Sequence, residues 1–178
     1  EALTAWFNPT INSYKRINAP VTASGATWSP NTITYSGNNR THMIRVPGPG
    51  RFELRLMDGA TNPYLLQAGI IAAGLDGIEK KRNPGKPVYV NMYEESHKVK
   101  GAKKLPSSLK KALQHLNNNK VMKSAFGKNV IGSYIKLKNK EIKKYSSSMV
   151  KVLGFRGTKK NYKKNIITQW EKDNTLDC

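Results

Sequence analysis

Charged and apolar side chains alternate along residues 50–58 in a pattern that can do chemistry. On a β-strand, successive side chains point to opposite faces, so Arg51, Glu53 and Arg55 share one face and the apolar residues between them line the other. Two guanidinium groups beside a carboxylate form an anion-binding site in one interpretation and paired charges on a solvated sheet in the other. The segments upstream favour the anion site.

Three further arginines precede this strand. Arg16 ends the polar stretch 8–16, and Arg40 and Arg45 lie in the stretch 39–47. Clustered fixed cations attract anionic groups. Five arginines and one glutamate in a mostly polar first third of the chain therefore predict an anion-binding site.

Length and composition bound the class of protein. The 178 residues can bury a modest core, and we expect one domain or part of one. A hydrophobic content of 38%, with three Trp and eight Tyr, argues against a disordered chain.

The single cysteine, Cys178, excludes an intrachain disulfide and is typical of a reducing compartment, so we expect a cytoplasmic protein. No stretch reaches the roughly 18 apolar residues of a membrane span. Because the chain begins with Glu1, we expect a piece of a longer polypeptide.

The positive charge lies in the second half. Residues 1–78 hold six basic and four acidic residues, a net charge of +2, whereas residues 79–178 hold 25 and seven, a net charge of +18. Such an excess can bind nucleic acid or an anionic membrane surface. However, only Arg82 and Arg156 among those 25 are arginine, and aromatic residues do not alternate with the lysines as a stacking surface requires. We favour a solvated lysine-rich surface and keep an anionic-surface binder as the second hypothesis.

Turn residues and apolar patterns predict the elements that position the arginines. Short strands are expected at 32–35, 41–46 and 51–56, and the turn at 47–50 makes the last two antiparallel. Asn62 and Pro63 open a helix that runs to Ile78 and is apolar almost all round, which predicts burial.

The second half is predicted to be mainly helical. Helices are expected at 109–116, with Ser107 as the N-cap, at 128–145, and at 161–171, with a break at 146–157. The predicted fold class is α+β, with antiparallel strands packed on helices. Residues 1–60 supply active-site loops and strands, and residues 61–178 supply the helical part.

Several motifs follow one another in a specific order. They are NPTINSYKR at 8–16, NR at 39–40, RVP at 45–47, RFELR at 51–55, ATNPY at 60–64 and AGLDGI at 73–78. This succession strongly resembles the C-terminal part of the catalytic domain of glutamine synthetases. The segments 23–28 and 175–178 resemble the branch that includes gamma-glutamylmethylamide synthetases and type III-like glutamate–ammonia ligases.

The resemblance implies a two-step ligation in which ATP phosphorylates the γ-carboxylate of glutamate and an amine, ammonia or methylamine, then displaces phosphate. Fixed cations and divalent metal ions stabilise such transfers between oxyanions. The resemblance assigns Arg16 and Arg55 to glutamate, Arg40, Arg45 and Arg51 to ATP, Arg40 and Arg55 to catalysis, and Glu53 to Mg²⁺ or Mn²⁺.

Two departures from the family pattern matter. The segment 16–20 is short and lacks the carboxylate that helps deprotonate ammonium in better-known members, which leaves the amine-activating base unidentified and weakly favours methylamine. The other metal ligands of the family lie upstream of Asn8, so the isolated chain is not expected to catalyse the full reaction. Because active sites of the family form between subunits, we expect a homo-oligomer, and a third hypothesis is a fragment that assembles without chemistry.

Overall fold

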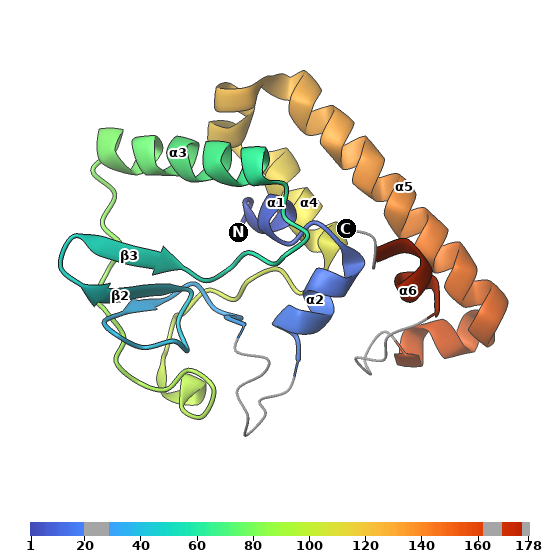
Figure 1. Ribbon diagram of the computed structural model, residues 1–178, viewed down its shortest axis with the longest axis horizontal. Helices are drawn as coiled ribbons and strands as arrows, with labels where there is room; N and C mark the ends of the chain where they lie inside the picture. The colour runs from blue at the N-terminus through green and yellow to red at the C-terminus, as the bar shows by residue number, and fades with distance from the viewer. Residues whose placement is uncertain (20–28, 162–168, 176–178) are drawn as a thin grey trace.

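The computed structural model describes residues 1–19, 29–161 and 169–175, and they form a small sheet beside a group of helices (Figure 1). The elements are α1 (Thr4–Phe7), α2 (Ile11–Ile17), β1 (Tyr35–Ser36), β2 (Ile44–Gly48), β3 (Arg51–Leu54), α3 (Pro63–Glu79), the 3₁₀ turn η1 (Ser96–Lys98), α4 (Leu109–Asn118), α5 (Lys120–Asn161) and α6 (Gln169–Thr175). The predicted α+β class is confirmed. The predicted strand at 32–35 is shorter than expected, because β1 begins only at Tyr35.

The sheet has the order β1-β2-β3. The antiparallel pairing of β2 with β3 agrees with the prediction, whereas β1 pairs with β2 in parallel, which the sequence did not indicate. Strand β2 also continues through Pro47, where we expected a turn. Proline is tolerated there because β1 pairs only with the first two residues of β2 and the register shifts between Arg45 and Gly48, so the missing N–H breaks no regular ladder.

Helix α3 begins as predicted but is not buried. Asn62 Oδ1 accepts hydrogen bonds from the N–H groups of Tyr64 and Leu65, and Pro63 takes the first helical position. However, Gly69 is its single buried residue, and Ile71 and its neighbours along one face are exposed. The prediction of a buried helix was wrong. A helix that is apolar all round needs a partner to cover it, but its sequence does not say whether that partner belongs to the same chain.

Helices α4 and α5 form the helical wall. The apolar face of α4 is buried as predicted, with Ser108 rather than Ser107 as the N-cap. Helix α5 begins eight residues earlier than the predicted start, and Gly127, with φ of +78°, marks a bend near that predicted start. The helix also continues through the predicted break, because Tyr145 and Met149 keep one face of α5 in the core. Part of the predicted helix 161–171 lies outside the described residues.

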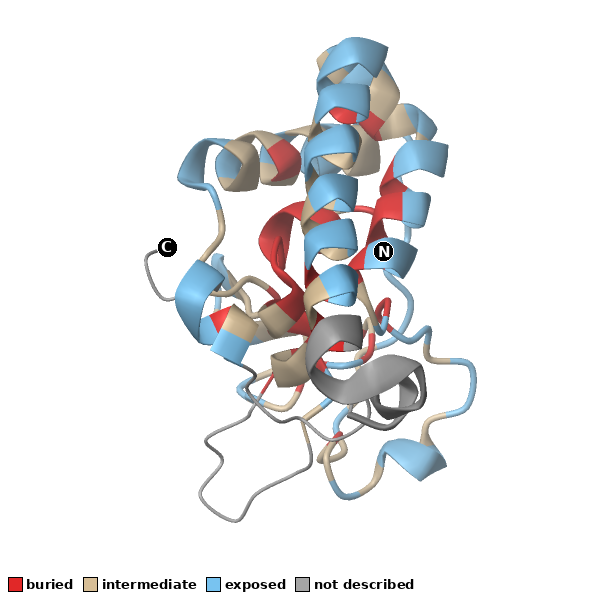
Figure 2. Ribbon diagram, turned by 90° about the vertical axis from the view of Figure 1, so that its right-hand side faces the viewer, coloured by how far each residue is buried: buried red, intermediate tan, exposed pale blue. Residues whose placement is uncertain are grey.

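The core centres on α1, whose four residues are all buried (Figure 2). The Trp6 ring packs edge-on against Phe126 of α5, with the ring centroids 4.9 Å apart. Tyr134 Oη of α5 donates a hydrogen bond to the Ala5 carbonyl at 2.7 Å. Truncating a fully buried residue such as Leu116 to alanine costs about 2–5 kcal/mol in comparable cores. No helix in the described ranges is both long enough and apolar enough to cross a bilayer.

Candidate active site

The β2–β3 hairpin holds one charged pair of the predicted site. Arg45 and Glu53 are opposite each other in the strand register, and Arg45 Nη1 donates to Glu53 Oε2 at 2.8 Å. The Nε and Nη2 groups of Arg45 donate to Asn38 Oδ1 at 2.9 and 2.5 Å. Because the guanidinium is held on two sides, its direction is fixed by the fold, and the Arg45 side chain is only 12% exposed.

Three guanidinium groups act on the carboxylate of Glu53. The hydrogen bond from Arg45 lowers the pKa of Glu53 from its ordinary 4.5, and the charges of Arg45, Arg55 and Arg51 lower the pKa further. Glu53 is therefore ionised at neutral pH. Its side chain remains 42% exposed, so the carboxylate is accessible to a further cation.

Arg55 connects this pair with a second polar group. Its charge acts on Glu53 and also on Arg16 and Tyr93, so Arg55 lies within electrostatic range of each of these three side chains. Burial lowers the pKa of Arg16, and the charge of Asp58 opposes that shift while Arg55 adds to it. Burial raises the pKa of Tyr93, so its phenol is protonated at neutral pH. Two partly buried guanidinium groups repel each other, and a bound anion would relieve that repulsion.

Arg16 is anchored from the opposite side of this group. Its Nη2 donates to Asn8 Oδ1 at 3.0 Å and to the Leu56 carbonyl at 2.7 Å, and the fully buried Asn8 also donates to that carbonyl. Arg16 Nε is buried without a hydrogen-bond partner among the described residues. Because Nη2 uses both of its hydrogens and Nε is buried, Nη1 is the group left for a ligand. Arg16 also lines a cavity of about 240 Å³, together with Thr10, Asn12, Ser13, Asp58, Gly59 and Ala60.

The sequence of α2 fixes where Arg16 points. Thr10 and Ser13 form a capping box, in which each side chain accepts a hydrogen bond from the backbone N–H of the other at 3.1 Å. Tyr14 and Ile17 are buried, so the helix cannot rotate without exposing them. Arg16 therefore leaves the last turn in one direction.

A buried histidine places Tyr93, which sequence reasoning missed. His42 is fully buried, with Nε2 3.0 Å from the Val90 carbonyl and Nδ1 3.0 Å from Thr34 Oγ1. Burial lowers the pKa of His42, and a carbonyl can only accept, so the neutral ring donates from Nε2 and accepts at Nδ1. Asn39 Nδ2 also donates to the Val90 carbonyl. These contacts hold the loop that carries Tyr93 against the turn before β2, a relation that no spacing in residues 83–106 signals.

The sequence and the fold match known proteins. The family profile described as "Glutamine synthetase, catalytic domain" matches residues 1–153. The chain belongs to the glutamine synthetase family. A glutamine synthetase of Rhizobium leguminosarum bv. phaseoli is 54% identical over 176 residues, which are 99% of this chain and 36% of the relative. The chain thus spans about a third of the length of such relatives.

Methylamine ligases are also similar. A glutamate–methylamine ligase of Methyloversatilis universalis is 46% identical over 147 residues, covering 81% of this chain and 33% of that protein. A solved complex of GmaS, a ligase of this kind, with ADP superimposes with a TM-score of 0.76 at 49% identity, over 99% of this chain and 36% of GmaS. The cryo-EM structure of Plasmodium falciparum glutamine synthetase, at 24% identity and a TM-score of 0.62 over 98% of this chain and 39% of that one, supports the fold.

Not every predicted site residue of this glutamine synthetase family member joins the group. Arg45, Arg51 and Arg55 act electrostatically on Glu53, and Arg55 also acts on Arg16, so these five residues form one chain of interactions. Arg40 lies in the turn before β2, where its exposed side chain forms no hydrogen bond or ion pair with a described residue. Its assignment to ATP and catalysis stays a prediction.

The residues present do not by themselves fit a metal site. Within residues 1–19, 29–161 and 169–175, no three His, Cys, Asp or Glu side chains cluster as metal ligands would. Glu53 offers one carboxylate, already bonded to Arg45, whereas Mg²⁺ takes six oxygen ligands. Metal binding therefore needs ligands beyond these residues.

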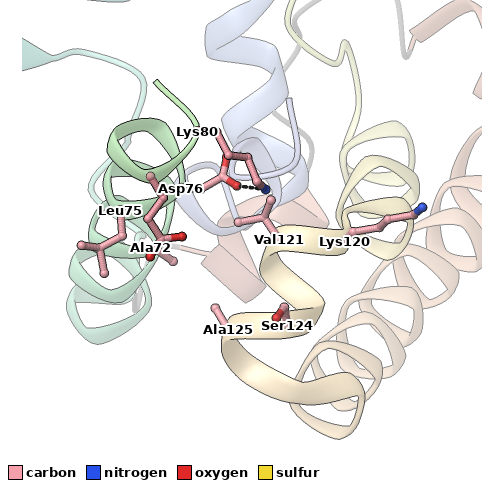
Figure 3. Close-up of a pocket in the computed structure, with 9 residues that line it drawn as sticks. Ala72, Leu75, Asp76, Lys80, Lys120, Val121, Ser124 and Ala125 are labelled. Atoms are coloured by element: carbon pink, nitrogen blue, oxygen red, sulfur yellow. Dashed lines mark hydrogen bonds and ion pairs between the residues drawn. The ribbon is translucent and has the colours of Figure 1, made fainter. Parts of the chain in front are cut away.

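A second cavity, which none of the predicted site arginines lines, lies between α3 and the start of α5 (Figure 3). It encloses about 390 Å³ between apolar residues such as Leu75 and Val121. Asp76 at its edge is paired with Lys80, and the Lys120 ammonium points away from the cavity. None of its lining residues is a predicted site residue, so this cavity is not the candidate active site.

Proposed function

We propose that this chain supplies the arginine-rich part of the active site of an ATP-dependent ligase that joins the γ-carboxylate of glutamate to ammonia. The observation that carries this proposal is the continuous group of charges from Arg16 through Arg55 to Glu53 and Arg45. Family membership supports it, since the family implies general use of ATP and a divalent metal. Because the chain spans a third of its relatives, the complete activity requires further polypeptide, in a homo-oligomer with shared sites.

The chemistry explains why fixed cations are needed. A γ-carboxylate oxygen of glutamate attacks the γ-phosphorus of ATP, the bond to the β,γ-bridging oxygen breaks, and ADP leaves. The amine nitrogen then attacks the carbonyl carbon of the γ-glutamyl phosphate, phosphate leaves with the C–O bonding electrons, and nitrogen loses a proton. Arg55 neutralises the negative charge on the glutamyl phosphate, while Arg16 holds the glutamate carboxylate through Nη1.

The remaining assignments concern ATP and the metal. Arg45, fixed by Glu53 and Asn38, presents its charge to the ATP phosphates, with Arg40 and Arg51 at the rim. Glu53 would offer one oxygen ligand to Mg²⁺ or Mn²⁺, with the remaining ligands supplied from outside the described residues, and the bound metal would neutralise phosphate charge.

A chimera tests the proposal. The 176 aligned residues of the Rhizobium leguminosarum glutamine synthetase are replaced by this chain, and glutamate-dependent release of phosphate from ATP is measured with ammonium. We expect activity in the chimera and a loss of about 100-fold or more in kcat for Arg55→Ala, the cost of removing one preorganised charge donor. The control is Arg82→Ala, because Arg82 pairs with Asp76 on exposed α3. An assembled chimera without activity, or an active Arg55→Ala variant, contradicts the proposal.

Methylamine is the second candidate for the amine. Residues 17–19 after Arg16 carry no carboxylate, and the 46% identical relative is named a methylamine ligase; residues 20–28 lie outside the described ranges. Comparing kcat/KM for ammonium and methylamine in the chimera decides between them. A preference for methylamine of about tenfold or more, equal to 1.4 kcal/mol, assigns the chain to that activity.

A further inference from the structure

The last turn of α2 is held on a second side, away from the contacts of Arg16. Lys15 Nζ donates to Glu171 Oε2 of α6 at 2.5 Å, across 156 positions of sequence. Successive residues on a helix project about 100° apart. Lys15 and Arg16 therefore leave α2 in different directions, Arg16 towards Asn8 and Leu56 and Lys15 towards α6.

This ion pair is buried. Glu171 is 0% exposed and the Lys15 side chain 15%. A buried carboxylate is strongly unfavourable unless it is paired, so Glu171 and Lys15 hold each other in place. Helix α6 is in turn attached to α5, where Trp170 packs edge-on against Tyr145 with ring centroids 5.1 Å apart.

We propose that Glu171 is a positioning residue for glutamate binding, which acts through Lys15 to fix the last turn of α2 and thereby the direction of Arg16. This inference rests on the proposed function of Arg16. A carboxylate that only stabilised the fold would change the thermal midpoint without selecting one substrate. A positioning residue changes the affinity for the substrate that Arg16 holds and leaves the affinity for ATP unchanged.

The first experiment uses the chain itself and does not depend on activity. Hydrogen–deuterium exchange is measured for the amides of residues 14–17 in the wild type and in Glu171→Gln. We expect exchange to rise several-fold in the variant, because the amide cannot replace the ionic partner of Lys15. The matched control, Glu141→Gln, removes the Lys138–Glu141 pair within α5 and should leave these amides unchanged. Equal exchange in Glu171→Gln and the wild type overturns the proposal.

The second experiment uses the active chimera. We expect Glu171→Gln to raise the KM for glutamate by roughly fivefold or more, a typical size for coupling between sites, with the KM for ATP unchanged. Reversing the pair, in Lys15→Glu with Glu171→Lys, should restore the KM for glutamate. Replacing both residues by Met should restore the thermal midpoint but not this KM. Equal changes in both KM values, or a lower midpoint with an unchanged KM for glutamate, overturn the proposal.

A wild-type chimera without activity refutes the proposed function, while the exchange experiment still decides on the role of Glu171.

Discussion

Two regions of this protein carry positive charge in different ways. Around the hairpin and α2, arginines are partly buried and tied to named acceptors, as Arg16 is to Asn8 and Arg45 to Asn38 and Glu53. Along α5, lysines such as Lys136 and Lys140 are exposed to solvent. A charge whose direction is fixed can recognise a ligand, whereas a flexible, hydrated ammonium mainly adds to the net charge. Most of the charge therefore lies in the region that contributes least to the proposed site.

The largest effect should follow from changing the most constrained arginine. Arg16→Lys removes the Nη2 group that donates to Asn8 and to the Leu56 carbonyl. We expect a loss of about 1–3 kcal/mol in the free energy of unfolding, because partly buried acceptors lose their donor. We also expect the KM of the chimera for glutamate to rise about tenfold or more, equal to 1.4 kcal/mol. Urea unfolding and steady-state kinetics measure both, and an unchanged KM would remove Arg16 from the site.

A smaller effect is expected at the hairpin. Arg45→Lys keeps the charge but cannot bond Asn38 and Glu53 together. Because the pair is partly exposed, we expect a loss of only about 0.2–1 kcal/mol in the free energy of unfolding. The loss of kcat/KM in the chimera, expressed as a free energy, is compared with the loss in the free energy of unfolding. A larger kinetic loss supports a role in catalysis, and a larger loss of stability makes Arg45 a structural residue.

The pH dependence of stability should show a weaker contribution from Glu53. Its pKa is lowered in the folded protein, so its ionised form stabilises the fold above pH 4.5, and that contribution disappears as the pH falls through the lower folded-state pKa. Glu53→Gln should therefore lose less stability than the wild type below pH 4.5. Thermal midpoints measured from pH 6 down to pH 3 check this, with the exposed Glu79→Gln as the control.

The smallest effect is expected on α5. Changing Lys136, Lys140 and Lys144 together to Gln should alter the free energy of unfolding by no more than about 0.5 kcal/mol per site and leave the chimera's activity unchanged. Binding to a random-sequence duplex at physiological salt serves as a second measurement. Tight, salt-dependent binding that the triple variant loses would instead support the hypothesis of an anionic-surface binder.

Helices α4 and α3 show what an apolar sequence pattern can and cannot predict. The spacing of Leu109, Ala112, Leu113 and Leu116 predicted both the helix and its buried face, because that face packs on α1 and α5 within this chain. The sequence of α3 predicted the helix and its N-cap equally well. The prediction that α3 is buried was wrong, because residues such as Ile71 find no partner among the described parts of this chain.

Local chemistry in the sequence determined the elements that bear the site and the residue types that can bind a phosphate or a carboxylate. Alternation predicted Arg51, Glu53 and Arg55 on one face of a strand at 51–56, of which β3 covers only Arg51–Leu54, and the order of motifs indicated the family. Only the tertiary structure decided that Tyr93 lies within electrostatic range of Arg16 and Arg55, and that Glu171 reaches Lys15. Those relations depend on burial and on contacts between residues far apart in the chain, such as His42 with Val90, which spacing in a sequence does not encode.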